Sequence, residues 1–325
     1  LPSTCAGIRT RKSLLPLSQA EYSCFSDLLT TLYRYYHLPI GAPGQLVHFF
    51  AKSSGTSFSF RRSTVDDEHD GIISFSLPIT FYTLSPKWIF YILSLILLEK
   101  RVVLVHRNIR ILSSILLSFI PLLRPFSYQS VFITILPLKM AEFLSAPVPY
   151  LIGMLSRPDP LRGYHPRSFR SRIRKHFSQS ENPVTPYGED FVLIDLEREE
   201  VLTMHENPWN VVPPLPRNDA LQSCVSRYFQ ELLEYTVELQ SYPYQPSPRH
   251  RSLTQAVSLS FEKYFASWVS DLPGHFVRDF SIKSEPITVF VPETFLAQEA
   301  GEDQAFFDAF FNTQIFRCYL DGILL

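Results

Sequence analysis

Residues 84–108 read LSPKWIFYILSLILLEKRVVLVHRN, and they are followed by ILSSILLSFIPLL at 111–123, FSYQSVFITILP at 126–137 and LKMAEFLSAPVPYLIGMLS at 138–156. Apolar segments with helical spacing alternate here with short apolar runs that contain almost no polar residue. This alternation is typical of a parallel sheet with covered faces. The stretch therefore predicts the order helix, strand, helix, strand, helix, strand in an α/β fold.

Two of the short apolar runs are predicted strands. Val102 to Val105 lies between the charged residues Glu99–Arg101 and the polar residues His106–Asn108, and it is too short for a helix. Val131 to Leu136 has the same character and ends at Pro137, which has no amide hydrogen to donate to a sheet. Both runs are expected to lie in the interior.

Two helices are predicted beside these strands. Asn108 is a suitable N-cap for a helix in which apolar residues recur at helical spacing, namely Ile109, Leu112, Ile115, Leu116 and Phe119. Upstream, Ser85 and Pro86 form a cap with proline at the first helical position, and Trp88, Ile92, Leu95 and Ile96 form the buried face.

The two predicted helices are apolar enough to be compared with membrane spans. The apolar runs Trp88 to Leu98 and Ile111 to Leu123 are 11 and 13 residues long. A transmembrane helix needs about 20 apolar residues. We therefore expect buried helices and no transmembrane segment; a secretory signal is also not visible at the start of the sequence.

Composition limits the kinds of partner that the chain can attract. The 325 residues are 46% hydrophobic and carry a formal net charge of -1, which gives no overall attraction to nucleic acid. The four cysteines, Cys5, Cys24, Cys224 and Cys318, are scattered, so neither a zinc site nor a disulfide framework is expected. Unpaired thiols are typical of a reducing cytosol.

Changes in periodicity predict three regions. Residues 1–71 contain a helix at about Glu21 to Tyr36 and then a polar link from Ser53 to Gly71. Residues 72–212 form the α/β sheet region, including a strand at Phe191 to Asp195, and Val211 to Pro216 is a linker.

Residues 213–325 are predicted to be mainly helical. Three amphipathic helices are expected, marked by Leu221, Val225, Tyr228, Leu232 and Tyr235, by Leu253, Val257, Phe261, Tyr264, Phe265 and Trp268, and by Phe306, Phe307, Phe310, Phe311, Ile315 and Phe316.

Motifs of known enzyme chemistry are missing from the sequence. It contains no GxSxG, no GxxxxGK[ST], no GxGxxG after a first strand and no HExxH. His106 is interpreted as a surface residue rather than a general base, and Asp190 and Asp195 as parts of a solvated acidic stretch rather than a catalytic pair. We expect no cofactor, no metal and no catalytic residue.

A basic loop at residues 157–177 carries seven Arg or Lys residues and one acid, Asp159. A contact with anionic lipid and a phosphorylation-controlled segment are both compatible with it, and so is a mobile insert kept soluble by charge. Its candidate residues are Arg167, Arg170, Arg172, Arg174 and Lys175.

Three strings of the sequence resemble the DENN-domain family, whose members regulate Rab GTPases. LLEKRVVLVHRN at 97–108, PFSYQSVFITILP at 125–137 and MAEFLSAPVPYLIGMLS at 140–156 resemble its central module in the right order. FFDAFFNTQIFRCYLDGIL at 306–324 resembles the end of its downstream module. Of the upstream, longin-like module, only the helix around Phe25 to Tyr36 is similar, so most of that sheet is expected to be absent.

The resemblance implies guanine-nucleotide exchange on a Rab-family small GTPase in vesicle trafficking and endocytosis. Such a protein binds the GTPase better without nucleotide than with it, and it performs no bond chemistry. The expected location is cytoplasmic, with peripheral contact to vesicle or endosomal membranes as an option. Three turns are the candidate GTPase contacts, namely Ser127, Tyr128 and Gln129; Ser145, Ala146, Pro147, Pro149 and Tyr150; and Gln314, Phe316 and Asp321.

Two alternatives stay open at the level of sequence. A GTPase-activating protein would need an exposed arginine, for which Arg61, Arg62 or the 157–175 loop are the candidates. An interaction scaffold would keep the fold without exchange activity. Rigid turns that serve the fold alone would also explain the Ala146-Pro147-Val148-Pro149 string.

Overall fold

The computed structural model describes residues 29–30, 32–34, 36–38, 42–51, 56–61, 64–158, 190–203, 205, 207–233, 247–279 and 287–324. The chain divides into two compact units, Leu1–Glu68 and His69–Leu325. The predicted boundary after residue 71 therefore lies close to this division, inside helix α2 (Val65–Thr83). The predicted boundary at 212/213 falls within the second unit and stays a prediction.

The first unit contains an antiparallel hairpin of β1 (Leu46–Ala51) and β2 (Thr56–Arg61). The described positions between 29 and 36 are helical, while Glu21 to Leu28 lie outside the described residues. The prediction of a polar link from Ser53 to Gly71 was wrong. Serine and phenylalanine alternate from Ser57 to Phe60, which is the period of a strand, and the acidic residues that follow belong to the first turn of α2.

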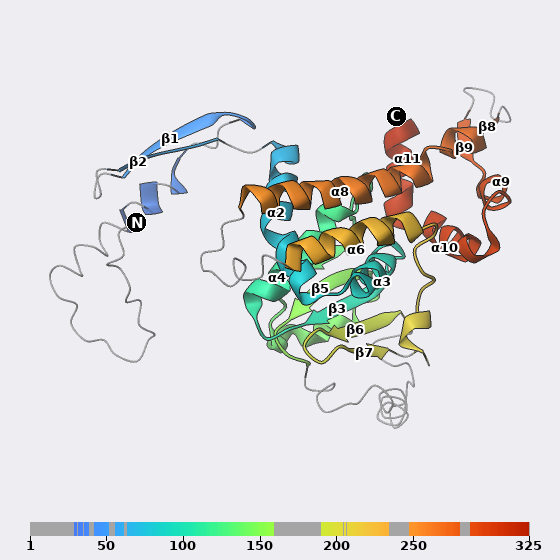
Figure 1. Ribbon diagram of the computed structural model, residues 1–325, viewed down its shortest axis with the longest axis horizontal. Coiled ribbons are helices and arrows are strands. Elements are labelled where there is room, and N and C mark those ends of the chain that lie inside the picture. The colour runs from blue at the N-terminus through green and yellow to red at the C-terminus, as the bar shows by residue number, and fades with distance from the viewer. Residues whose placement is uncertain are drawn as a thin grey trace. The chain divides into compact units, whose positions relative to one another are not determined.

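The second unit is built on a five-stranded sheet with the order β4-β5-β3-β6-β7 (Figure 1). The strands are β3 (Arg101–Val105), β4 (Val131–Ile133), β5 (Tyr150–Met154), β6 (Phe191–Asp195) and β7 (Glu200–Thr203). All neighbours are parallel except β6 and β7, which pair antiparallel. The predicted mostly parallel α/β sheet is therefore confirmed, although the edge strand β4 is shorter than expected and half-buried rather than interior.

Alternate residues of the sheet enter two separate cores. Val102 and Leu104 of β3 belong to the larger core, which also contains the buried faces of the helices. Val103 and Val105 belong to a smaller core with Leu144. Because side chains alternate across a strand, both faces of the sheet are buried.

The first helices after α2 start as the sequence predicts. In α3 (Pro86–Leu97), proline occupies the first turn and the Ser85 carbonyl accepts hydrogen bonds from the amides of Trp88 and Ile89. In α4 (Ile109–Leu122), the Asn108 side chain accepts from the amides of Arg110 and Ile111 at 3.0 and 3.3 Å. The short 3-10 helix η1 (Leu138–Ser145) then leads from β4 to β5.

The C-terminal part is mainly helical, as predicted. Its helices are η3 (Pro208–Asn210), α6 (Asp219–Leu233), α8 (Pro248–Val269), η4 (Leu272–His275), α9 (Pro292–Leu296), α10 (Gly301–Phe311) and α11 (Gln314–Leu324). The third predicted helix is in fact two helices, because the chain leaves α10 at Asn312 and the Thr313 hydroxyl caps α11 by accepting from the Phe316 amide. A hairpin of β8 (Phe276–Asp279) and β9 (Ile287–Phe290) was not predicted.

An aromatic cluster joins the sheet region to these helices. Phe126, just before β4, contacts Phe265 and Trp268 of α8 and Phe310 of α10, with ring centroids 5.9, 6.2 and 5.0 Å away. Trp268 in turn contacts Phe306 at 5.4 Å. Because these rings are buried, the α/β part and the helical part of this unit share one core.

A buried ion pair fixes the end of β5 to the β6–β7 hairpin. The Arg157 guanidinium donates to Asp195 Oδ2 at 2.7 Å and also to the Glu200 carboxylate. Both Arg157 and Asp195 are only 6% exposed. Two interpretations were therefore wrong: Asp195 is not on a solvated surface, and Arg157 is a core residue rather than part of a basic insert. The candidates from Arg167 to Lys175 lie outside the described residues.

Membrane-spanning potential is limited in the described residues. No single helix there has both the length and the apolar character of a membrane span. The helical segments His69–Thr83 and Pro86–Leu97 together have that length and composition, but the chain bends by 118° between them. Residues Ile89 to Leu97 of this pair are buried in the protein core.

Gly153 in β5 is a sensitive test of this packing. A Cβ atom at this position would collide with the Thr134 carbonyl oxygen and with Leu116. We expect Gly153→Ala to lower the free energy of unfolding by about 1–3 kcal/mol. Gly71→Ala is the matched control, because nothing lies within 4 Å of a Cβ there. Since Gly71 is in a helix, alanine should raise stability by about 0.5–1 kcal/mol. Urea denaturation would measure the change in unfolding free energy for both variants. Equal changes in Gly153→Ala and Gly71→Ala would contradict the close packing around Gly153.

The Arg157 ion pair gives a second stability prediction. Arg157→Ala leaves the Asp195 carboxylate buried without its main partner, so we expect a loss of about 3–5 kcal/mol in urea denaturation. Adding Asp195→Asn should recover part of the loss. Arg198→Ala is the control: Arg198 Nε is 3.9 Å from the same carboxylate but the side chain is 63% exposed, so the change should be below about 1 kcal/mol. Comparable losses from both arginines would contradict the assignment.

Candidate functional site

The amino ends of the parallel strands gather most of the predicted contact residues. The turn at 127–130 precedes β4, and the turn at 146–149 precedes β5. The Val131 amide donates to the Pro149 carbonyl, which joins the two turns, and Arg101 Nη1 lies 3.5 Å from the Ala146 carbonyl oxygen. We call this surface the amino edge.

Glu99 attaches α11 to the amino edge. Glu99 follows α3 with a positive φ of 51°, a conformation that glycine usually adopts at the end of a helix. The Lys100 amide donates to the Leu95 carbonyl, which is the hydrogen bond expected for such a helix end. Its two carboxylate oxygens accept from the backbone amides of Gln314 and Ile315, each at 3.0 Å. A carboxylate at a helix N-terminus is favoured by the unsatisfied amides and the helix dipole. The third candidate segment, Gln314 to Asp321, is therefore the start of helix α11 rather than a turn, and its first residue lies at the same edge.

Tyr128 is one of the half-buried candidates at this edge. Its hydroxyl donates to the Val131 carbonyl at 3.3 Å. Burial, and then the negative charge of Glu99, raise the pKa of the Tyr128 phenol well above its ordinary value. The phenol therefore stays protonated, and it serves as a hydrogen-bond donor within the turn.

The candidate contact residues differ in their accessibility. Exposed ones are Ser127, Gln129, Ser145, Pro147, Gln314 and Asp321, while Tyr128, Ala146 and Pro149 are half-buried. Tyr150 and Phe316 lie in the core, with 0% and 1% exposure. The Tyr150 hydroxyl donates to the Leu144 carbonyl, and Phe316 packs on Phe290. These two side chains hold the turns from inside and offer no surface to a partner.

Two residues of the edge were missed at the level of sequence. Glu99 and Arg101 were interpreted only as charges that delimit a strand. A charged residue where a helix is expected to end in glycine was the available signal for Glu99. Arg101 gave no signal, because its contact with Ala146 joins residues far apart in the sequence.

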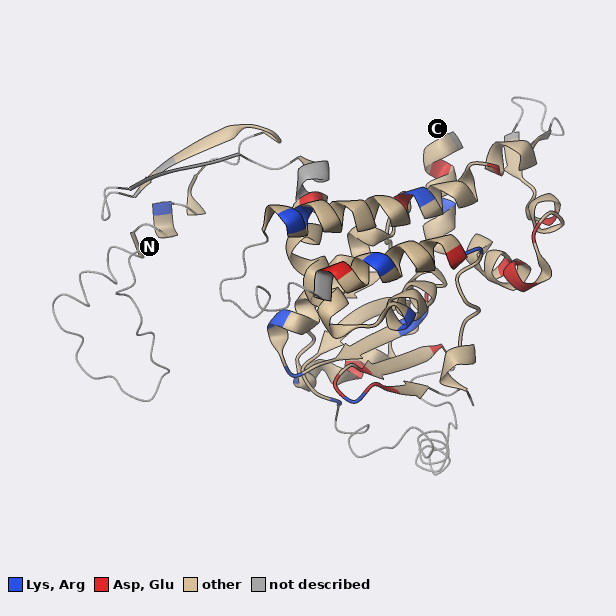
Figure 2. Cartoon of the chain, in the orientation of Figure 1, with Lys and Arg blue, Asp and Glu red and all other residues tan. Residues whose placement is uncertain are grey.

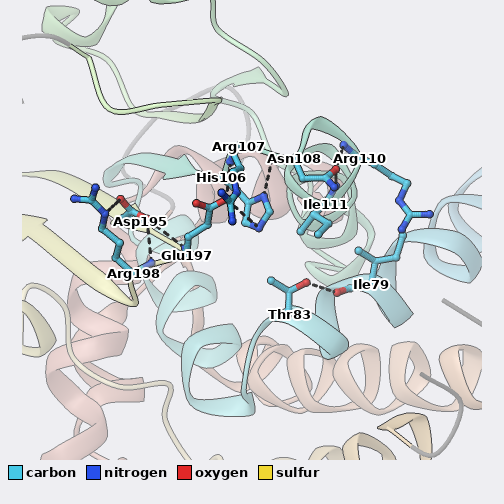
Figure 3. Close-up of polar contacts among 10 residues, drawn as sticks. All are labelled: Ile79, Thr83, His106, Arg107, Asn108, Arg110, Ile111, Asp195, Glu197 and Arg198. Carbon is cyan, nitrogen blue, oxygen red and sulfur yellow. Dashed lines mark hydrogen bonds and ion pairs between the residues drawn. The ribbon is translucent and has the colours of Figure 1, made fainter. Parts of the chain in front are cut away.

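The carboxyl ends of the same strands form a second polar region, a hollow of about 470 Å³. His106 and Arg107 face Glu197 (Figure 3), with Arg107 Nε 2.9 Å and His106 Nε2 3.8 Å from its Oε1. His106 is half-buried, and its Nδ1 accepts from the Asn108 amide at 3.0 Å. These groups satisfy one another, and no three His, Cys, Asp or Glu side chains in the described part of the chain could together hold a metal ion.

Neither the amino edge nor the carboxyl edge of the sheet carries charge of one sign alone. Figure 2 shows Lys and Arg interspersed with Asp and Glu over the described elements. At the amino edge, Lys100 Nζ lies 2.6 Å from Asp190 Oδ1, so this cation is compensated locally. A partner at this edge would therefore meet shape and hydrogen-bonding groups rather than a field of one sign.

Comparison with known proteins gives matches of one kind. Residues 11–167 match the DENN (AEX-3) domain. The chain is 24% identical to DENN domain-containing protein 2A of Homo sapiens over 278 residues, which are 85% of this chain and 24% of that protein. It is 24% identical to human DENN domain-containing protein 2C over 226 residues, 69% of this chain and 21% of that protein.

A shorter segment is more similar. The chain is 32% identical to human DENN domain-containing protein 2B over 124 residues. These residues are 38% of this chain and 11% of that protein. The chain thus spans less than a quarter of the length of these relatives. From the domain match and these relatives, residues 11–167 of this chain belong to the DENN-domain family.

Proposed function

We propose that this chain promotes GDP release from a Rab-family small GTPase by binding the nucleotide-free GTPase more tightly than the loaded one. The DENN-domain match over residues 11–167 is the observation that carries the proposal. Exchange on Rab proteins is the activity implied by the resemblance of the central and downstream strings. The proposed setting is membrane trafficking on the cytoplasmic side of vesicle or endosomal membranes.

The mechanism is differential binding. If the surface binds the empty GTPase more tightly by a certain factor, then by linkage it lowers the affinity of the GTPase for GDP by the same factor. This needs a surface that keeps its shape, because ordering a flexible surface on binding reduces affinity.

The amino edge supports such a surface. Pro147 and Pro149 restrict the turn before β5, and the Val131 amide ties this turn to the one before β4. Glu99 holds the first turn of α11 beside them. The exposed candidates for GTPase contact are Ser127, Gln129, Ser145, Pro147, Gln314 and Asp321.

Exchange assays on a panel of Rab proteins loaded with fluorescent GDP test the proposal. We expect the chain to accelerate GDP release from at least one of them. The double variant Ser127→Arg, Ser145→Arg should reduce that acceleration at least tenfold, since bulky cations would replace small side chains at the contact. Ser252→Arg, at an exposed serine of α8, is the matched control and should leave the rate unchanged.

The same assay separates the other functions. Accelerated GTP hydrolysis without GDP release would replace the proposal by a GTPase-activating function. Binding of a Rab protein without either effect would replace it by a scaffold. No effect on any Rab protein would reject it.

Glu99 gives a further prediction about the same surface. Glu99→Gln keeps the size of the side chain but removes the charge that caps α11, so we expect about 1 kcal/mol lower stability and faster hydrogen exchange at the amides of Gln314 and Ile315. GDP release should slow at the same time. Ser247→Ala serves as the control. The Ser247 hydroxyl caps α8 by accepting from the His250 amide, and alanine removes this cap. It should lower stability similarly without changing GDP release; equal slowing in both variants would show an effect of stability alone.

A further inference from the structure

A groove in the second unit lies away from the amino edge. It has a volume of about 630 Å³ and is formed by α3, η3, the 211–216 linker and α6. Figure 1 shows α6 beside α3, and the two helices are in contact. Lys87 lies in the first turn of α3 and Glu99 just beyond its last, so at 1.5 Å per residue they are about 18 Å apart. The volume is in the range of ligand sites in proteins.

One wall of the groove is apolar and fixed in place. Trp209 contacts Tyr91 and Trp88, each with ring centroids 4.9 Å away, and the Tyr91 hydroxyl donates to the Pro208 carbonyl at 2.5 Å. Burial raises the pKa of the Tyr91 phenol, so it remains a donor. Phe90 and Leu215 are buried behind this wall, while Trp209 is 36% exposed. The wall presents a preformed aromatic surface.

A stripe of neutral polar side chains, from the residue before α6 into its first half, also lines the groove. Asn218, Gln222 and Ser226 line the groove at intervals of four residues, which is about 6 Å along a helix. Asn218 Nδ2 donates to the Leu215 carbonyl at 2.7 Å, and its oxygen remains an acceptor. Within the described part of the chain, Gln222 and Ser226 make no side-chain hydrogen bond. The stripe offers donors and acceptors at a regular repeat.

This repeat fits an extended peptide. Backbone groups on one side of an extended chain repeat every two residues, about 6.7 Å, which is close to the spacing of the stripe. Alternate side chains of such a peptide would face the aromatic wall. An acyl chain would pack against the apolar wall equally well. It would also cover the polar stripe without forming hydrogen bonds to it, and covering polar groups in this way is unfavourable.

The charge of the groove selects the kind of peptide. Lys87 is the charged residue among those that line it, and its ammonium lies 3.9 Å from the centroid of the Trp209 ring. Lys87 has no carboxylate partner among the described residues. A carboxylate of a bound peptide would supply that partner.

We propose that the groove between α3 and α6 binds an extended peptide of a partner protein that has alternating apolar residues and an acidic residue facing Lys87. The binding is independent of nucleotide exchange and needs no GTPase. Trp209 provides the central apolar contact, and the α6 stripe provides backbone hydrogen bonds.

A phage-displayed library of random octapeptides, selected on the whole chain and counter-selected on Lys87→Glu, tests the proposal. We expect enriched peptides to share an acidic residue next to alternating apolar residues. A synthetic enriched peptide should bind Lys87→Glu at least tenfold more weakly, and the same peptide with lysine for its acidic residue should prefer Lys87→Glu to the wild type. Gln222→Ala should weaken binding about fivefold.

Matched controls and a local readout complete the test. Lys263→Glu and Gln255→Ala change exposed residues of α8 outside the groove and should leave the affinity unchanged. Peptide binding should shift the fluorescence of Trp209 to shorter wavelength. Trp209→Phe should remove most of that shift, since Trp268 is buried and Trp88 does not line the groove. The proposal is overturned if no peptide is enriched, if enriched peptides bind Lys87→Glu as well as the wild type, or if dodecanoate binds in a Lys87-dependent way while peptides do not.

Discussion

Burial of both faces of one mostly parallel sheet is the constraint on which the rest of the second unit depends. Val102 and Leu104 of the central strand enter one core, while Val103 and Val105 enter the other. Because the side chains of a strand alternate, a shift of the register by one residue would exchange the two sets. The larger core continues through Phe126 into the aromatic residues of α8 and α10. The helical C-terminal part therefore completes the core of the sheet.

This constraint explains why the amino edge can present a fixed surface. Tyr150, the first residue of β5, is buried and anchors the turn before this strand from the interior through its bond to the Leu144 carbonyl. Glu99 adds a contact that glycine could not make. Its positive φ is unfavourable for a residue with a Cβ atom. Its carboxylate offsets this by capping α11.

The parts of the fold that the sequence predicted are those determined by local patterns. Val102 to Val105 and the Asn108-capped helix need only a short apolar run and a cap to be identified. The split between α10 and α11 was missed because apolar residues continue across Asn312 and Thr313. Arg157 and Asp195 were misjudged because each lies in a charged stretch. The pairing of β6 with β7 brings Asp195 and Glu200 together, and the parallel pairing of β3 with both β5 and β6 brings Arg157 to them. Long-range contacts of this kind leave no local pattern.

The site could be predicted in part for the same reason. The turns before β4 and β5 follow from strand boundaries, whereas their connection to α11 depends on a contact between residues 215 positions apart. Helix α3 connects the features discussed above. Its residues from Ile89 to Leu97 are buried, so its two ends are held at a fixed separation. Glu99 at one end belongs to the amino edge and Lys87 at the other to the groove. A chain that acts by shape would thus use one rigid helix to present two surfaces, and neither surface requires a reaction centre.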